Sequence, residues 1–299
     1  MISQVHPRRW TGVLVGAVLA LWCYAFTIAL LWRGLTADID VALVGLYLAA
    51  GLFFALGSLF AYWTYCCWTL EYDLDRNGLT IRWGDIRQHV PMDRIERLVP
   101  GGEYPAPKIS GVNWLGHHIG KADVEGLGAV LVYATNIAAD DLLYVVTQTQ
   151  TYGISVSDEA RFAHDLQGHQ KLGQLISLPQ VTERTAIAAQ PFWHDPIAQG
   201  LAMLSVLAFA VTVGYVFNQY PGLPNSIPFA FPSLGSVTRV GDKDGLLAIP
   251  ITGVGLLAIN LVLGYILHAW DRAVGYLLFL AASGMQVMLL AAAIITIHQ

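Results

Sequence analysis

Charged residues are scarce in this sequence. Asp, Glu, Lys and Arg make up 12% of the 299 residues, which is half of the roughly 25% found in soluble domains. So few charged side chains cannot cover a surface that faces water on all sides. We therefore expect that a large part of the chain faces lipid. The net charge of −5 at pH 7 gives no support to nucleic-acid binding, which needs a clear basic surface.

Cysteine is also sparse. Cys23, Cys66 and Cys67 all lie in apolar runs, which is not the spacing of a disulfide framework. We interpret them as small buried hydrophobic residues, in preference to sites of lipidation or metal binding.

Motifs that carry chemistry are missing. The sequence has no H-E-x-x-H zinc motif, no phosphate-binding loop and no nucleophile elbow, which are short motifs of hydrolytic and phosphate chemistry. Asp, Glu, Lys and Arg are absent from the middle of every long apolar run, where ion-coupled transporters usually place one. The sequence therefore favours a protein that is neither an enzyme nor a transporter, and it predicts no cofactor and no bound metal.

Long apolar runs, in contrast, are abundant and fall into two blocks. A helix that crosses a bilayer needs about 20 apolar residues, and five runs reach that length. They cover residues 11–32, 41–68, 197–217, 245–268 and 273–297. The first run exceeds the roughly 7–15 apolar residues of a signal peptide, so we predict five uncleaved membrane spans.

A polar stretch with the pattern of β-strands lies between the two blocks. Alternation of polar and apolar residues predicts strands near 69–74, 79–83, 86–90, 129–134, 142–147 and 152–156. Asn77-Gly78 marks a hairpin turn, and a short helical turn is expected over 91–98. Residues 99–128 are rich in Gly and Pro and predict a long irregular loop, a feature that is often functional. Ser157 is expected to cap a closing helix that places Phe162 and Leu166 on one face.

Several segments of this stretch share an order of glycines and aromatic residues. They are residues 110–120 (SGVNWLGHHIG), 126–128 (GLG), 133–135 (YAT) and 152–157 (YGISVS), followed by Phe162 and Leu166. This order resembles bacterial pleckstrin-homology (PH) domain proteins over about a third of the chain. The resemblance implies a small barrel of antiparallel strands, closed by a C-terminal helix, that binds a protein or a lipid.

Four side chains of the predicted loop are candidate contacts for such a partner or lipid: Trp114, His117, His118 and Lys121. A metal site at His117 and His118 with Asp123 is less favoured, because structural zinc takes four ligands and catalytic zinc three. We interpret the two histidines as facing solvent or lipid headgroups. The dense basic loop with which many eukaryotic PH domains bind anionic lipid is absent.

A second resemblance concerns the loop between the third and fourth predicted spans. The residues that carry it are Pro224, Ile227, Pro228, Gly235 and Lys243. Their pattern is similar to a membrane domain of unknown function in bacterial toxin-immunity and stress-signalling proteins. That family usually has a His where this chain has Ala230, so no role of the His is carried over. Because Pro fixes φ and removes a donor, we interpret the loop as a rigid structural cap.

Polar and small residues inside the spans have modest interpretations. Asn260 and Gln286 are neutral amides, which commonly form hydrogen bonds between membrane helices. Gly12 and Gly16 have the G-x-x-x-G spacing, which permits close helix approach. We interpret both features as helix packing.

Basic residues beside the spans predict the orientation. Arg8, Arg9 and Arg272 place the N-terminus and residues 68–196 in the cytoplasm by the positive-inside rule, with residues 218–244 and the C-terminus outside. The basic residues that disagree are Arg33, Arg239 and Lys243.

The sequence thus predicts an α-helical polytopic membrane protein with five transmembrane helices and an inserted β-rich PH-like domain that ends in a helix. The expected parts are a two-helix hairpin (1–68), the PH-like domain (69–170), a linker (171–196) and a three-helix membrane domain (197–299). We expect a non-enzymatic protein of the bacterial plasma membrane that binds a protein partner, a lipid or a second copy for sensing, assembly or signalling. The alternatives are an accessory subunit of a larger membrane complex and a metal-dependent membrane enzyme or transporter.

Overall fold

The computed structural model describes residues 3–176, 179–230 and 238–298. The chain forms two compact units. The first holds the residues up to Tyr24 together with Ala55–Ala189, and the second holds Ala25–Phe54 and the residues from Gln190 onward. Gly235, one of the predicted cap residues, lies outside the described residues.

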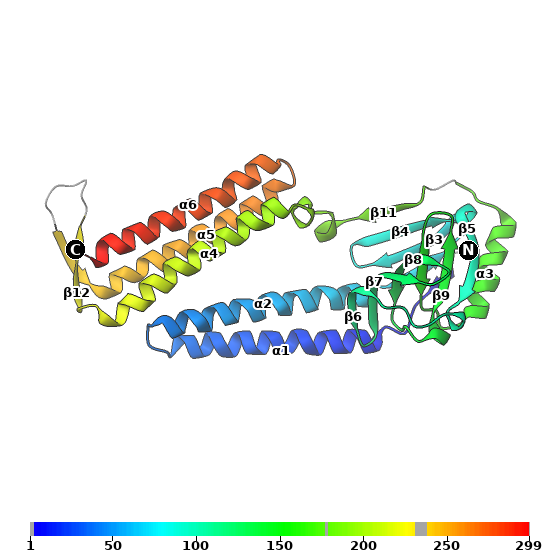
Figure 1. Cartoon of the computed structure of the whole chain (residues 1–299), viewed down its shortest axis with the longest axis horizontal. Coiled ribbons are helices and arrows are strands. Elements are labelled where there is room, and N and C mark those ends of the chain that lie inside the picture. The colour runs from blue at the N-terminus through cyan, green and yellow to red at the C-terminus, as the bar shows by residue number, and fades with distance from the viewer. Residues whose placement is uncertain (1–2, 177–178, 231–237, 299) are drawn as a thin grey trace. The chain divides into compact units, whose positions relative to one another are not determined.

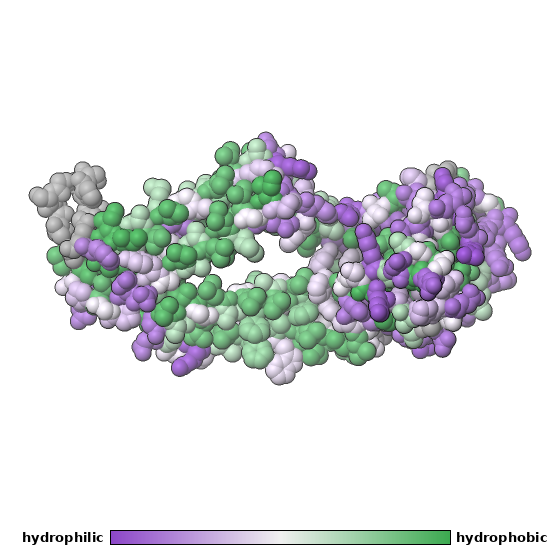
Figure 2. Space-filling model, viewed as in Figure 1, coloured by the Kyte–Doolittle hydropathy of each residue, from purple (hydrophilic) through white to green (hydrophobic). Residues whose placement is uncertain are grey.

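Five helices in the described part are long and apolar enough to cross a bilayer. They are α1 (Trp10–Leu35), α2 (Val41–Trp68), α4 (Pro196–Gln219), α5 (Ala248–His268) and α6 (Arg272–Ile297) (Figure 1). The five predicted spans are confirmed. Hydrophobic side chains cover these helices, whereas hydrophilic side chains cover the strand-rich domain (Figure 2).

Helices α4, α5 and α6 pack through small and polar residues. Ser205 Oγ of α4 donates to the carbonyl oxygen of Phe279 in α6 at 2.8 Å. At the start of α4, Asp195 accepts the backbone N–H of Ile197 at 3.0 Å and the hydroxyl of Tyr276 at 2.6 Å. Lipid tails are as apolar as Leu, so close packing and hydrogen bonds, and not hydrophobic burial, hold membrane helices together.

The polar stretch between the membrane blocks is rich in strands, as predicted. One five-stranded sheet has the order β1-β2-β3-β4-β11. Its strands are β1 (Ser3–Val5), β2 (Glu71–Leu74), β3 (Gly78–Trp83), β4 (Ile86–Pro91) and β11 (Val181–Arg184). Strands β1 and β11 come from either side of residues 69–170, so the sheet also recruits the N-terminal segment and part of the predicted linker.

A six-stranded sheet has the order β5-β9-β10-β8-β7-β6. Its strands are β5 (Ile95–Pro100), β6 (Ser110–Trp114), β7 (His117–Val124), β8 (Gly128–Ala134), β9 (Leu143–Thr147) and β10 (Thr151–Ile154). Strands β8 and β10 are parallel, whereas the resemblance implied antiparallel strands throughout.

Helix α3 (Glu159–Leu172) follows the second sheet. Phe162 and Leu166 are buried on its inner face, as predicted, and pack with residues of both sheets in one core. The predicted cap is wrong by one residue. The Asp158 carboxylate, and not the Ser157 hydroxyl, accepts the N–H of Arg161 at 2.9 Å.

The predicted hairpin at Asn77-Gly78 is present between β2 and β3. The carboxylate of Asp75 accepts the N–H groups of Asn77 and Gly78 at 2.8 and 2.9 Å. Gly78 adopts a φ of +158°, and a Cβ there would lie 2.2 Å from the carbonyl oxygen of Val90. Only glycine allows so close an approach.

Two further predictions for this domain are wrong. Residues 99–128 do not form an irregular loop, because β6 and β7 pair within them as an antiparallel hairpin. Gly111 and Gly120 face each other in that pairing, and their missing side chains hide the alternation expected of strands. The helical turn over 91–98 is limited to Met92–Arg94, and β5 begins at Ile95.

The segment between α4 and α5 contains two antiparallel strands, β12 (Ser226–Ala230) and β13 (Thr238–Asp242), which pair with each other. Ile227 is buried. The backbone N–H of Lys243 donates to the Asn225 carbonyl at 3.0 Å, and its ammonium lies 4.8 Å from the Tyr220 ring centre. The capping role of Pro224, Ile227, Pro228 and Lys243 stays a prediction.

Candidate functional site

The turn between β6 and β7 packs against the start of α1. A Cβ built on Gly12 of α1 would lie 2.2 Å from the carbonyl oxygen of Gly116, and a Cβ on Gly116 would lie 2.4 Å from the nitrogen of Gly12. Gly116 also has a φ of +82°. The thiol of Cys67, near the end of α2, donates to the Gly116 carbonyl oxygen at 3.7 Å. Glycine at 12 and 116 therefore allows the backbones of helix and hairpin to touch.

Gly16 has a similar role one turn further along α1. A Cβ at Gly16 would lie 2.2 Å from the hydroxyl oxygen of Thr64 in α2 and 3.3 Å from the ring of Trp114. The two glycines with G-x-x-x-G spacing thus serve packing inside the chain, with Gly12 against the strand hairpin and Gly16 against α2.

Trp114 fills the space beside this contact. Its ring centre lies 5.9 Å from that of Phe60 and 5.4 Å from that of Trp63, both in α2. Aromatic pairs at such distances stabilise a contact beyond the area they bury. Trp114 therefore joins the hairpin to the membrane helix, and its role as a contact to a partner or lipid stays a prediction.

His117 is enclosed in the same contact. Its side chain is fully buried, and its ring lies 5.3 Å from Trp114 and 6.2 Å from Trp83. Burial, with a smaller contribution from His118, lowers the pKa of His117 to about 4. A neutral, enclosed imidazole faces neither solvent nor headgroups, so that interpretation of His117 is wrong.

His118 and Lys121 lie elsewhere on the same strand. His118 is 9% exposed, its Nδ1 is 2.6 Å from Oδ1 of Asn113, and burial lowers its pKa. Lys121 is exposed and lies three residues beyond His118, about 10 Å along an extended strand. The four candidate residues therefore divide between an aromatic contact (Trp114 and His117), a buried histidine (His118) and an open strand surface (Lys121).

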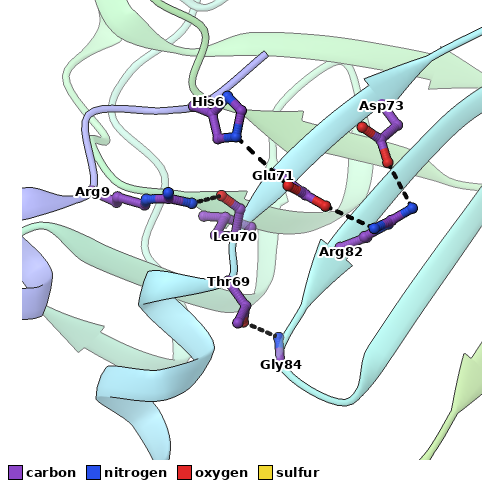
Figure 3. Close-up of polar contacts among 8 residues, drawn as sticks. All are labelled: His6, Arg9, Thr69, Leu70, Glu71, Asp73, Arg82 and Gly84. Atoms are coloured by element: carbon purple, nitrogen blue, oxygen red, sulfur yellow. Dashed lines mark hydrogen bonds and ion pairs between the residues drawn. The ribbon is translucent and has the colours of Figure 1, made fainter. Parts of the chain in front are cut away.

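Polar contacts also tie the first sheet to the chain segments that enter and leave the membrane (Figure 3). The guanidinium of Arg9 donates to the Leu70 carbonyl at 3.4 Å. The imidazole of His6, just before α1, lies 3.7 Å from the Glu71 carboxylate of β2. Within the sheet, Arg82 of β3 pairs with Glu71 at 2.9 Å and with Asp73 at 3.0 Å. Burial raises the pKa of Asp73, and the charge of Arg82 opposes that shift.

A cavity of about 260 Å³ opens where the start of α1 meets the domain. Its enclosed lining includes His118, Thr135 and Ser155, all at most 9% exposed. Its exposed rim includes Arg8 and Asp141. The remaining lining residues are Thr11, Leu115, Gly116, Asn136, Val156 and Ser157.

Sequence reasoning singled out only His118 of this lining as a ligand contact. Arg8 served only as an orientation signal and Ser157 only as a helix cap. One available signal was the repetition of small polar residues directly after strands, at Thr135-Asn136 and at Ser155. No local pattern in the sequence predicts the contribution of Arg8 and Thr11, because it depends on the pairing of β1 with β2 and on the contact between Gly12 and Gly116.

Metal binding has no geometric support in this region. Across residues 3–176, 179–230 and 238–298, no three His, Cys, Asp or Glu side chains come together so that they could hold a metal ion. His117 and His118 are consecutive on β7 and point to opposite faces of the sheet.

Comparison with known proteins bears on residues 70–170, which match the family model of the bacterial PH domain. No curated protein and no solved structure matches the chain. The family match does not reach the C-terminal helices, so their resemblance to toxin-immunity proteins is not confirmed. With its five apolar helices, the chain is a multi-pass membrane protein that carries a domain of the bacterial PH type at residues 70–170.

Proposed function

We propose that the protein is a non-enzymatic recognition module of the bacterial plasma membrane, in which the PH-like domain is held against the headgroup layer. The observation that carries this proposal is the backbone contact between Gly12 and Gly116. It fixes the β6–β7 turn to the first turn of a membrane-spanning helix, so the domain cannot swing away from the bilayer on a free linker.

Aromatic residues support the same placement. Trp10, at the start of α1, and Trp68, at the end of α2, are 63% and 45% exposed, and they pack edge to face with ring centres 5.2 Å apart. Tryptophan is enriched at the headgroup level of bilayers. The β6–β7 turn contacts α1 two residues from Trp10, so the domain meets lipid at that level.

The role in recognition rests on the PH-like fold and on the polar cavity at its membrane side. Binding of a protein, a lipid or a second copy can be read by native mass spectrometry of the full chain released from nanodiscs that were made directly from native membranes. We expect a stoichiometric lipid, a second copy or a partner protein to stay bound. A chain that is always monomeric and bare would contradict the proposal.

Cytoplasmic placement of the domain is part of the proposal and rests on Arg8, Arg9 and Arg272. The test uses Glu125→Cys, in the exposed turn after β7, and Asp242→Cys, at the exposed end of β13. With a membrane-impermeant maleimide on intact cells, we expect Asp242→Cys to react and Glu125→Cys to react only after lysis. The reverse pattern would invert the orientation. The unsubstituted chain, with its three native cysteines, is the control.

A further inference from the structure

We propose that the cavity beside the start of α1 binds the headgroup of an aminophospholipid, a phosphate followed by a primary ammonium. This inference rests on the proposed function and names a ligand for the same membrane-facing side of the domain. Its first basis is size. At about 260 Å³ the cavity is near the lower limit of roughly 300–1,000 Å³ for small-molecule sites, which suits a headgroup and not a large ligand.

The second basis is the level at which the cavity opens. Arg8 and Thr11 of its rim flank Trp10, the residue at which α1 begins. Leu115 completes this side of the rim and is 69% exposed at the tip of the hairpin. A large apolar side chain so exposed beside a membrane helix suits contact with acyl chains. A lipid of the leaflet that faces the domain can therefore place its headgroup in the cavity without leaving the bilayer.

The third basis is the arrangement of charge. Arg8, on the α1 side of the rim, supplies a cation for a phosphate. Asp141, at the end of the short turn Ala139–Asp141, lies on the domain side of the same rim and carries the opposite charge. This order matches the order of groups in the lipid, in which the phosphate lies nearer the acyl chains and the ammonium lies farther out.

The surroundings of Asp141 favour a cation further. Burial raises the pKa of Glu159, and the charges of Asp141 and Asp140 add smaller increases in the same direction. Asp158, the cap of α3, adds another exposed carboxylate nearby. Asp141 is the carboxylate that lines the cavity. Its charge, with those of the carboxylates beside it, would repel a purely anionic headgroup, which makes a ligand with its own positive end the better fit.

The floor of the cavity supplies matching hydrogen-bond groups. The Asn113 amide oxygen accepts from Nδ1 of His118, so Nε2 of a neutral His118 is left to accept a hydrogen bond from an ammonium. Ser155 Oγ accepts the backbone N–H of Thr135 at 2.9 Å, and the two hydroxyls lie 3.1 Å apart. One of these hydroxyl protons therefore remains for an acceptor such as a phosphate oxygen.

The test measures lipid binding to the full chain in mild detergent by native mass spectrometry. The probes are dihexanoyl phosphatidylethanolamine, its choline and glycerol counterparts, free phosphoethanolamine and inorganic phosphate. We expect the ethanolamine lipid to bind about tenfold more tightly than the other two, as for one charge-assisted hydrogen bond. Phosphoethanolamine should displace it and inorganic phosphate should not. Equal binding of the three lipids, or equal displacement by inorganic phosphate, would overturn the proposal.

Two variants locate the site. Asp141→Asn keeps a polar side chain beside Asn136 and should reduce ethanolamine-lipid binding about tenfold while leaving the choline lipid unchanged. Arg8→Gln should weaken all three lipids. The matched controls are Asp123→Asn on the exposed side of β7 and Arg94→Gln, whose guanidinium bonds Gln148. Unchanged binding in both cavity variants, with their melting temperatures also unchanged, would refute the site.

Failure here is distinguishable from failure of the proposed function. The chain could retain a protein partner or another lipid from native membranes and yet show no preference for the ethanolamine lipid. That result would contradict the ethanolamine site and would leave the proposed recognition function standing. A chain that binds the ethanolamine lipid through Asp141 and Arg8 supports both.

Discussion

The hydroxyl of Tyr72 donates to the backbone carbonyl of Tyr133 at 2.6 Å across the core of the PH-like domain. The same oxygen accepts the N–H of Ser155 at 3.2 Å, so one phenol links β2 of the first sheet to β8 and the end of β10 in the second. Full burial raises the pKa of Tyr72 to about 12. This link connects the two sheets next to Ser155, which lines the floor of the cavity.

Tyr72→Phe should therefore destabilise the domain. The substitution removes the hydrogen bonds of the phenol to a buried carbonyl and a buried N–H, and a buried polar group that loses its partner costs about 1–3 kcal/mol. Urea unfolding followed by the near-ultraviolet circular dichroism of the full chain in detergent measures the change. Tyr104→Phe, a half-buried ring that packs edge to face on Tyr144, is the control and should change stability less. Equal effects of the two variants would show that the Tyr72 hydroxyl contributes little.

Gly116→Ala should loosen the contact between domain and membrane helix. A Cβ there meets the backbone nitrogen of Gly12 at 2.4 Å and is held at a φ of +82°. Together the overlap and the strain cost about 2–4 kcal/mol. Limited proteolysis at the β6–β7 hairpin and the emission of Trp114 report the loss.

Gly128→Ala separates the effect of backbone strain from the effect of steric overlap with Gly12. Gly128 also has a positive φ, +71°, but a Cβ there meets no atom within 4 Å. This variant should cost only the roughly 1–2 kcal/mol of left-handed backbone strain and should leave the hairpin protected from protease. If it exposed the hairpin as much as Gly116→Ala, the close approach to Gly12 would not be what holds the domain to the helix.

The sequence was sufficient for features that depend on local pattern. Runs of apolar residues located all five spans, Asn77-Gly78 located a hairpin, and the spacing of Phe162 and Leu166 located the buried face of α3. Each of these follows from neighbours within about one or two turns of chain. The same local reasoning missed β6 and β7, because Gly111 and Gly120 interrupt the alternation that identifies a strand.

The cavity could not be predicted from the sequence, for a different reason. Its rim combines Arg8 with Asp141, residues that lie 133 positions apart in the numbering and line one cavity because β1 pairs with β2 and Gly12 touches Gly116. Nothing in the local pattern of either segment predicts that contact. The burial of His117 has the same origin, since Trp83 and Trp114 come from different strands, and a histidine beside glycines in a polar stretch otherwise suggests an exposed loop.

Gln286→Leu should weaken the packing of α6 on α5. The Gln286 amide donates to the carbonyl oxygen of Gly253 at 2.8 Å, which confirms the predicted pairing of helices for this residue. Hydrogen bonds between membrane helices contribute about 0.6–2 kcal/mol. Thermal unfolding in a single detergent, read by far-ultraviolet circular dichroism, measures the change.

Asn260→Leu is the matched comparison. The Asn260 amide donates to Leu256 of its own helix at 2.8 Å, and its contact across to α6 is the sulfur of Met285 at 3.9 Å. This residue therefore contributes less to helix pairing than predicted. We expect a smaller loss than for Gln286→Leu, and a larger one would show that the weak sulfur contact is the stronger link.

Stability should fall in mild acid because of His117. The pKa of His117 is about 4 in the folded domain and about 6.5 in an unfolded chain. Between these values the unfolded state binds more protons, so stability decreases as the pH falls from about 6.5 to 4 and is independent of this group above that window. The full loss is roughly 3 kcal/mol, and the lowered pKa of His118 acts in the same direction.

His117→Leu should remove most of this pH dependence. It should also leave stability at pH 7 equal or higher, because neither ring nitrogen of His117 has a hydrogen-bond partner among the described residues and burying an unpaired polar group is unfavourable. Urea unfolding at pH 4.5, 5.5 and 7 measures both effects, with the exposed His164 of α3 changed to Gln as the control. A His117→Leu chain that still loses stability in acid as steeply as the unsubstituted one would mean that the imidazole already takes up its proton in the folded domain, and that the aromatic contact with Trp83 and Trp114 is open to water.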